Sequence, residues 1–155
     1  MNLPDITVRA AVTADTSAMS TLAYRSKKSN GYDTRVMEFF KEGLNITPDR
    51  LARRPFWVAE VESRIVGCIA LEMLDNATGE VRTFFTDPNH RARGVGYELW
   101  QVLLTVAQAQ GITRLLAHAD PVSMRYYQNL GFVQNGEVAS RNIPGETVPF
   151  MVREI

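Results

Sequence analysis

The sequence predicts an α/β protein of the α+β type, in which helices flank a mixed, mostly antiparallel sheet. The expected order of elements is β-α-α-β-β-β-α-β-α-β-β. Three observations support this fold class. Helical spacing of apolar residues dominates the first third of the chain, and consecutive β-rich runs fill residues 56–86. A basic loop with two glycines, Gly94 and Gly96, then joins the last of these runs to an amphipathic segment.

The first third of the chain reads as one strand and two helices. Residues 6–12 are expected to form a strand, and Thr13 to cap a helix that runs to about Arg25. A second helix is expected from near Asp33 to Leu44. Thr47 followed by Pro48 is typical of a helix cap with proline in the first helical position, so one more short helical turn is expected there.

The remaining elements follow from β-rich runs and glycine or proline breaks. Residues 56–61 and 64–74, separated by Glu62 and Ser63, predict a hairpin. Residues 80–86 form the strand before the basic loop, and the helix after it is expected over 95–110 with Gly111 as its C-cap. The last expected elements are a strand (114–119), a short helix (122–129) and two strands (132–138 and 148–153). Pro149 implies an edge position or a bulge.

The bulk composition restricts the function classes. The 155 residues suit a single domain over 1–155, and 17 basic residues balance 17 acidic ones. This balance gives no electrostatic case for binding nucleic acid or a membrane surface. A single cysteine, Cys68, excludes an internal disulfide and fits a reducing compartment. The N-terminus has no signal-peptide pattern, so we expect a cytoplasmic protein.

The loop between the central strand and the long helix has the composition of a phosphate site. The spacing is Arg-x-x-Gly-x-Gly, with Arg91, Gly94 and Gly96 at the fixed positions. The first N–H groups of a helix have no internal partner and attract anions, and glycine lets the backbone approach a ligand closely. The spacing matches neither the dinucleotide fingerprint nor a Walker loop. A strand-to-helix turn with solvated arginines is the alternative interpretation.

Two segments together resemble the GCN5-related N-acetyltransferases, the GNAT superfamily. The first is the Arg-x-x-Gly-x-Gly loop, and the second is residues 119–132, which end in Tyr-Tyr-x-x-x-Gly-Phe. The resemblance covers residues 80–132 and extends to a tail over 140–151. It implies that acetyl-CoA is bound as co-substrate by residues of the strand, loop and short helix: Phe84, Phe85, Thr86, Arg91, Ala92, Arg93, Gly94, Val95, Gly96, Ser123 and Tyr127.

The resemblance also implies transfer of an acetyl group to a primary amine of a small molecule or peptide. Tyr127 falls on the tyrosine position of the family and would protonate the departing thiolate, whereas Tyr126 is interpreted as an aromatic anchor. Glu80 is the candidate base, directly or through water, and the alternative is a rim charge paired with neighbours. Strand alternation places Glu80, Arg82, Phe84 and Thr86 on one face. Asp87 is expected to cap the turn.

The chain departs from the family pattern at two positions. Arg82 stands where many members have a carboxylate, and Val122 where they often have an asparagine. A CoA-binding module without catalysis is therefore the alternative function, and a nucleotide-binding protein is a third. No cluster of metal-ligand residues is found at ligand spacing, so no metal is expected. A homodimer through the C-terminal strands is compatible with the resemblance.

Acceptor selection is expected to lie in residues 24–44 and in the loop 139–147. Tyr32 and Phe40 are the candidate substrate-binding residues, with simple packing as the alternative. Lys27 either attracts an acidic acceptor or is solvated at the end of its helix. His118 is either a hydrogen-bonded core residue or a proton relay. The sequence does not name the acceptor.

Overall fold

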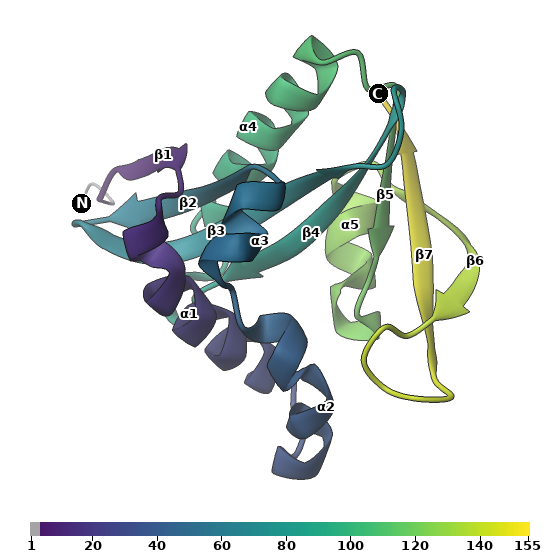
Figure 1. Ribbon diagram of the computed structural model, residues 1–155, viewed down its shortest axis with the longest axis horizontal. Coiled ribbons are helices and arrows are strands. Elements are labelled where there is room, and N and C mark those ends of the chain that lie inside the picture. The colour runs from purple at the N-terminus through teal and green to yellow at the C-terminus, as the bar shows by residue number, and fades with distance from the viewer. Residues whose placement is uncertain (1–3) are drawn as a thin grey trace.

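The computed structural model describes residues 4–155, and within these residues seven strands form one sheet (Figure 1). The strands are β1 (Ile6–Ala10), β2 (Phe56–Val61), β3 (Arg64–Met73), β4 (Thr78–Thr86), β5 (Arg114–His118), β6 (Val133–Ala139) and β7 (Thr147–Glu154). Their order across the sheet is β1-β2-β3-β4-β5-β7-β6. Only β4 and β5 pair in parallel among these strands, so the predicted mixed, mostly antiparallel sheet is confirmed.

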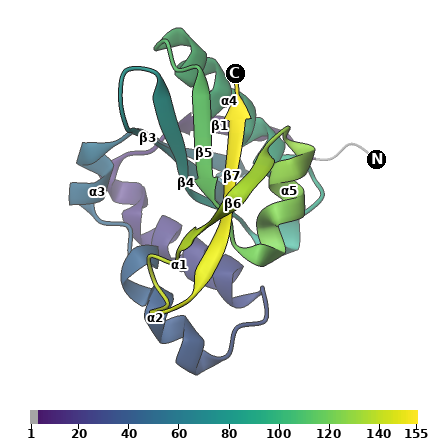
Figure 2. The same ribbon diagram turned by 90° about the vertical axis from the view of Figure 1, so that its right-hand side faces the viewer.

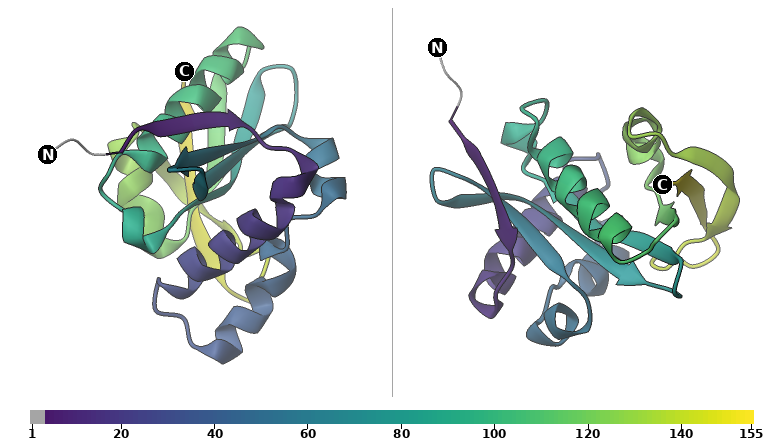
Figure 3. Two further views of the ribbon diagram at one scale, coloured as in Figure 1. Left: turned by 90° about the vertical axis from the view of Figure 1, so that its left-hand side faces the viewer. Right: turned by 90° about the horizontal axis from the view of Figure 1, so that it is seen from above.

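Helices cover both faces of the sheet (Figure 3). They are α1 (Thr16–Lys28), α2 (Thr34–Leu44), α3 (Pro48–Arg53), α4 (Val95–Ala109) and α5 (Met124–Asn129). The apolar side chains of α1 and α2 pack on one face of the sheet and those of α4 on the other. The predicted order of elements is confirmed, with α3 as the short helical turn expected after Thr47.

Local capping and turn signals were reliable guides to the element boundaries. The Thr47 side chain accepts a hydrogen bond from the Arg50 N–H at 3.3 Å, as expected of an N-cap. Glu62 and Ser63 both have positive φ, 52° and 64°, which two-residue hairpin turns require. Gly111, with φ 84°, follows the end of α4 in the left-handed conformation.

The start of α1 differs from the prediction. Thr13 does not cap this helix, because residues 13–15 form a short 3-10 turn and α1 begins at Thr16. The Asp15 carboxylate accepts a hydrogen bond from the Val12 N–H at 2.8 Å and pairs with Arg9 at 2.8 Å. The Asp15 carboxylate, held by two partners, thus fixes the chain two residues beyond the predicted cap, and α1 begins at the next residue.

Pro149 lies in β7, which is an interior strand between β5 and β6 (Figure 2). Proline lacks the N–H that a continuous ladder needs. The register between β6 and β7 shifts between Gln134 and Glu137, so that one extra residue of β6 is accommodated, and Glu137 is paired with Pro149. The bulge, one of the two expected solutions, is therefore the one that the fold uses.

Strand β4 also contains a bulge, at Thr83. Because of it, the side chains of β4 that share a face differ from those predicted. Cys68 of β3 pairs with Phe85 and Ala70 pairs with Arg82, so β4 has one extra residue between them. Thr83 has φ 52°, in the left-handed region. Phe85 consequently packs with the α1–α2 side and Phe84 with the α4 side. Glu80 and Arg82 therefore share their face with Phe85, and the expectation that Phe84 and Thr86 share it is wrong.

Strands β4 and β5 pair over only three residues, Thr78–Glu80 with Arg114–Leu116. Beyond Glu80 the two strands separate, and β4 continues to Thr86 without a partner on that side. The start of α4 is held beside this gap because Gly67 of β3 has no side chain. A Cβ there would lie 2.8 Å from both Leu99 Cδ1 and Val95 Cγ1. The fold therefore places a helix N-terminus next to an opening in the sheet.

Candidate functional site

A cavity of about 940 Å³ occupies the opening between β4 and β5. The exposed stretch of β4, residues 80–86, forms one wall. The loop before α4 and the start of α5 surround one end. At the other end, α2 and the β6–β7 connection face the buried part of β4. We call these ends the loop end and the buried end.

The loop end is lined by residues 90–92 and 94–97. Gly94 is the N-cap of α4 with φ 86°, and Ala92 also has positive φ, 62°. Because Gly94 has no side chain, no cap covers the first N–H groups of the helix, and these groups are available to an anion. A Cβ on Gly96 would overlap the Tyr126 hydroxyl, so glycine is needed for α5 to approach the start of α4.

Two arginines tether the loop end to α1. Asp87 accepts a hydrogen bond from the Asn89 N–H at 2.9 Å, which confirms that it caps the turn, and pairs with Arg25 at 3.0 Å. Burial raises the pKa of Asp87, but the Asn89 N–H and the Arg25 charge outweigh it and hold that pKa below its usual value. Arg91 donates to the Ser29 hydroxyl at 2.5 Å. The loop is thus held by its neighbours at both ends.

Most of the residues expected to bind acetyl-CoA line this cavity. The structure brings together Phe84, Phe85, Thr86, Arg91, Ala92, Gly94, Val95, Gly96, Ser123 and Tyr127. Arg93 is the exception, since it is exposed and does not contribute to the wall. Val122, at the position of the expected asparagine, is 62% exposed and lies beside Ser123 on the cavity wall.

Tyr126 and Tyr127 have different surroundings from those expected. Tyr127 is the buried anchor, with its ring centroid 5.3 Å from that of Phe132 and 6.2 Å from that of Phe84. Tyr126 is 40% exposed, and its hydroxyl lies over Gly96. The interpretation of Tyr126 as the anchor is therefore wrong. Tyr127 also lines the cavity, and burial raises the pKa of its phenol, which stays protonated at neutral pH.

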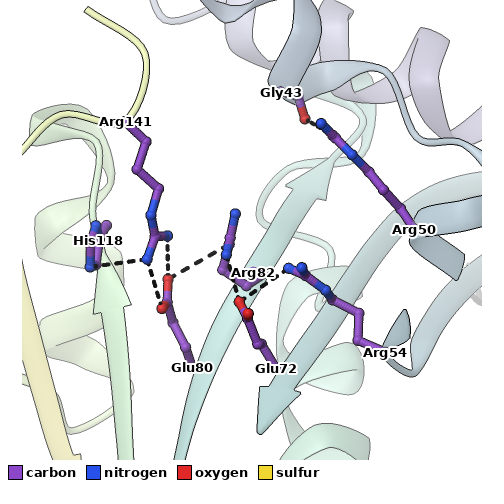
Figure 4. Close-up of polar contacts among 8 residues, drawn as sticks. All are labelled: Gly43, Arg50, Arg54, Glu72, Glu80, Arg82, His118 and Arg141. Atoms are coloured by element: carbon purple, nitrogen blue, oxygen red, sulfur yellow. Dashed lines mark hydrogen bonds and ion pairs between the residues drawn. The ribbon is translucent and has the colours of Figure 1, made fainter. Parts of the chain in front are cut away.

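The buried end contains a carboxylate, Glu80, that is only 2% exposed (Figure 4). The Arg141 guanidinium donates two hydrogen bonds to it, at 2.5 and 2.9 Å, and Arg82 lies 3.6 Å away. Burial raises the pKa of Glu80, but Arg141 and Arg82 outweigh it, so that pKa lies below its usual value. Glu80 is paired with its neighbours, as the alternative interpretation held, although deep in the molecule and not at a rim.

His118 stands beside this ion pair at the end of β5. Its Nε2 lies 3.5 Å from a guanidinium nitrogen of Arg141, and its buried Nδ1 has no hydrogen-bond partner among residues 4–155. Burial, together with the Arg141 charge, lowers the pKa of His118 below its usual value. The imidazole is therefore neutral at pH 7 and able to accept a proton.

Lys27, Tyr32 and Asp120 form a second polar group on the wall. Lys27 Nζ lies 2.7 Å from Asp120 Oδ2, and the Tyr32 hydroxyl donates to the same oxygen at 2.6 Å. Lys27 also lies 4.3 Å from the centre of the Phe40 ring. Tyr32 and Phe40 both line the cavity, with their ring centroids 5.0 Å apart. Lys27 is thus paired within the wall and not solvated.

Arg141 is the residue of this site that the sequence did not single out. Its strand-to-strand connection, 139–147, was expected to select the acceptor, and Arg141 is the one cation in it. That single basic residue, in a connection whose one acidic residue is Glu146, was the available signal. The distance along the chain to Glu80, sixty-one residues, hid the contact.

Other reactive groups lie outside this arrangement. Cys68 is buried in β3, and burial raises the pKa of its thiol to about 12, in agreement with its interpretation as a small apolar residue. Within residues 4–155 no three His, Cys, Asp or Glu side chains are grouped as metal ligands. No helix in the same range is long and apolar enough to cross a membrane.

The chain is similar to known acetyltransferases in sequence and in fold. Residues 20–132 match the family described as "Acetyltransferase (GNAT) family". Human N-acetyltransferase 8 is 29% identical over 121 residues, which are 69% of this chain and 53% of that protein. The chain spans about half the length of the curated relatives it matches.

Two solved structures show the same fold over nearly all of both chains. A GCN5-related N-acetyltransferase from Rhodopseudomonas palustris has a TM-score of 0.82 at 18% identity and covers 100% of this chain and 98% of its own. The PaiA N-acetyltransferase from Thermoplasma acidophilum, in complex with coenzyme A, has a TM-score of 0.81 at 17% identity, with coverage of 97% and 99%. Fold and family match agree, and the chain belongs to the GNAT acetyltransferase family.

Proposed function

We propose that this protein transfers an acetyl group from acetyl-CoA to a primary amine, by direct attack of the amine in a ternary complex. The observation that carries the proposal is the single cavity that joins the loop end to the buried end through the gap between β4 and β5. A phosphate-binding helix terminus and a pair of proton acceptors, Glu80 and His118, thus open into the same space. Both substrates can meet there without leaving the protein.

The loop end fits the pyrophosphate of CoA. Gly94 leaves the first N–H groups of α4 uncapped, and the left-handed Ala92 turns the preceding backbone toward the same point. Arg91, which donates to the Ser29 hydroxyl, is within the cavity wall and supplies charge. Arg93 is outside the wall, so we assign the pyrophosphate to Arg91 and the backbone.

The gap between the strands fits the pantetheine arm. Beyond Glu80, β4 has no β5 partner, so backbone groups of residues 81–86 remain for the amides of the arm. The arm would lie against Phe84 and Ser123, both in the wall. Many family members have an asparagine at the position of Val122. We assign its hydrogen bonds with the pantetheine arm to Ser123, because the Ser123 hydroxyl can donate and accept hydrogen bonds.

The chemistry needs one proton removed and one supplied. The amine nitrogen attacks the thioester carbonyl, the C–N bond forms, and the C–S bond breaks to release the thiolate. Tyr127, protonated at neutral pH, is assigned the proton donation to sulfur. Glu80 is assigned the binding of the incoming ammonium and, directly or through water, its deprotonation. The neutral imidazole of His118 is the adjacent proton acceptor.

A calorimetric titration of acetyl-CoA, with free CoA and ATP as controls, tests the cofactor part. We expect micromolar binding of acetyl-CoA and of CoA, and weak binding of ATP. Gly94→Glu should weaken acetyl-CoA binding by more than about tenfold, because its carboxylate stands where the pyrophosphate binds. Gly111→Glu is the matched control: Gly111 has nearly the same φ, 84° against 86°, equally open surroundings, and sits at the other end of the same helix.

Two outcomes would contradict the proposal. Absence of acetyl-CoA binding at millimolar concentration would show that the loop before α4 is only a structural turn, and the proposed transferase function would be wrong. Tight binding without turnover of any amine in a broad panel would favour the non-catalytic CoA-binding module. Equal loss of binding in both glycine variants would show that strain at positive φ, and not the phosphate site, caused the effect.

A further inference from the structure

Five charged side chains form a continuous ion-pair network behind the buried end (Figure 4). Glu72 lies 2.6 Å from Arg82 and 3.2 Å from Arg54. Glu80 lies 3.6 Å from Arg82 and pairs with Arg141 at 2.5 Å. Three guanidiniums thus share two carboxylates. Since arginine stays protonated, the network has one positive charge in excess.

The remaining charges of the cavity do not offset this excess. Lys27 and Asp120 neutralise each other at 2.7 Å. Glu146 also lines the cavity, but it is exposed to water, where screening weakens its field. His118 is uncharged at neutral pH. The buried end is therefore a site that favours an acceptor with negative charge over one with additional positive charge.

Arg141 is the member of the network that can move away from Glu80. It is carried by residues 140–146, a connection that we call the strap, and its side chain is 42% exposed. Arg82, by contrast, is fixed within β4. Glu80 is too buried to be left without a cation. An incoming ammonium has the charge and the donors needed to take the place of the Arg141 guanidinium.

The strap itself is held by its own turn and by contacts with the helices α1 and α2. The Ser140 hydroxyl accepts hydrogen bonds from the N–H groups of Asn142 and Ile143, which fixes the turn that carries Arg141. Ile143 packs against the apolar cluster of α1 and α2. Gly43 of α2 lets the strap approach closely, since a Cβ there would lie 3.0 Å from Asn142 Oδ1. Arg141 can thus leave Glu80 by side-chain rotation while the strap stays in place.

On the basis of the proposed function, we propose that the acceptor is an amine with a carboxylate beside it, as in an amino acid. Its ammonium pairs with Glu80, and its carboxylate pairs with the released Arg141 and with Arg82. This exchange leaves every buried charge with a partner. A polyamine or a lysine-rich peptide would instead add positive charge to a wall that already has an excess.

Apolar residues of the cavity wall indicate the rest of the acceptor. Tyr32, Val36, Phe40 and Ile143 line the cavity, and they offer apolar and aromatic surface. An uncharged, apolar side chain on the amino acid would bury area against them. We therefore choose phenylalanine and methionine as probes.

The test compares matched acceptors that differ only in the carboxylate. L-phenylalanine, L-phenylalaninamide and 2-phenylethylamine form one set, L-methionine with its amide and decarboxylated amine form another, and spermidine represents polyamines. We expect kcat/KM for the amino acids to exceed that for their amides by about 10- to 100-fold, the range that charge-assisted hydrogen bonds give. Spermidine should be the poorest acceptor.

Arg141→Met is the decisive variant. It should reduce the preference for carboxylate over amide to below about threefold, because the partner of the carboxylate is gone. Arg114→Met is the control, since Arg114 pairs with the exposed Glu154 outside the cavity wall, and it should keep the wild-type preference. Calorimetric titration of the same acceptors into the CoA-loaded protein gives the preference without turnover.

The outcomes separate this inference from the proposed function. Amides or simple amines that react as well as the amino acids would overturn the inference and leave the transferase intact. Failure of every amino acid to bind the CoA-loaded protein would overturn it as well. Loss of the proposed function would show itself independently, as an absence of acetyl-CoA binding in the titration described above.

Discussion

At the scale of single residues, burial decides what a charged side chain can do. Glu80 was a candidate base because of its place in the strand before the glycine-rich loop. Its role depends on an ion-pair partner that the sequence of this strand does not indicate. A carboxylate 2% exposed needs a cation, and here the cation is Arg141, sixty-one residues later. Sequence patterns identify such a carboxylate only as a charged residue in a strand. The pairing of side chains that are distant in the sequence leaves no mark in the residues around either one.

Replacement of Tyr127 tests the assignment of the proton donor. Tyr127→Phe keeps the ring that packs against Phe84 and Phe132 and removes only the hydroxyl. We expect kcat to fall about 100-fold, the lower range for a lost general acid, while the KM for acetyl-CoA changes little. Steady-state kinetics with a saturating amine measures both quantities.

Tyr126→Phe is the matched control, since it removes the neighbouring hydroxyl, which lies over Gly96. We expect its kcat to stay within about threefold of wild type, because that hydroxyl is assigned no proton transfer. Equal losses in the two variants would remove the distinction between the two tyrosines. An unchanged kcat in Tyr127→Phe would show that the thiolate leaves without this proton.

At the scale of the elements, turns and caps were readable and the bulge in β4 was not. Thr47 and Gly111 mark helix ends because their chemistry is local. The bulge at Thr83 lies in a run of residues with high strand propensity, and threonine gives no sign of a positive φ. The packing of Val81 and Phe84, three residues apart, on the same side of the sheet imposes it, since regular alternation would place them on opposite sides. The prediction of which side chains face the site therefore failed after Arg82.

Thr83→Pro tests the importance of this bulge. Proline fixes φ at about −65° and cannot adopt the 52° of Thr83. With the extra residue kept but the bulge lost, regular alternation would make Phe84 and Phe85 exchange faces, and the core on both sides of the sheet would lose an aromatic ring. We expect the free energy of unfolding to fall by at least about 3 kcal/mol, the cost of a large core truncation, and acetyl-CoA binding to be lost. Urea unfolding and calorimetry measure the two effects.

Thr83→Gly is the control for that substitution. Glycine adopts φ 52° without a Cβ penalty, so the bulge is kept. Its stability should stay within about 1 kcal/mol of wild type, because the relief of strain offsets the greater freedom of the unfolded chain. A proline variant as stable as Thr83→Gly would mean that the strand adjusts its register elsewhere.

At the scale of the whole molecule, the order of elements was predictable and the joining of distant segments was not. Periodicity and turn residues predicted helices on a mostly antiparallel sheet, and the resemblance placed most of the cofactor residues. The buried end is assembled by contacts between α1, β4, β5 and the strap, which lie far apart in the sequence. Such contacts depend on tertiary packing, and only the site residues near the glycine-rich loop were predicted as a group.

Four buried carboxylates link these distant segments, and each has its pKa below the usual value. They are Asp15, Glu80, Asp87 and Asp120, paired respectively with Arg9, Arg141, Arg25 and Lys27. For Asp15 the hydrogen bonds from Arg9 are the main cause. For the other three, burial raises the pKa, and their cations and hydrogen bonds outweigh it. The folded state thus binds fewer protons than the unfolded state in mildly acidic solution.

Stability should therefore decline on the acid side as these carboxylates are protonated. Since each folded pKa is lowered, the contribution is present above the unfolded pKa, about 4 for a carboxylate, and is lost as pH falls through the folded values. Urea unfolding should show a small decline as pH falls through about 6.5, where the unfolded state protonates His118 before the folded state does, and a steeper decline below about pH 4. Asp120→Asn should make that decline shallower, because one lowered pKa is removed, while Glu154→Gln, in an exposed pair, should not. An unchanged slope in Asp120→Asn would show that its pairing with Lys27 and Tyr32 does not persist in solution, and the wall between α1 and the end of β5 would then be open.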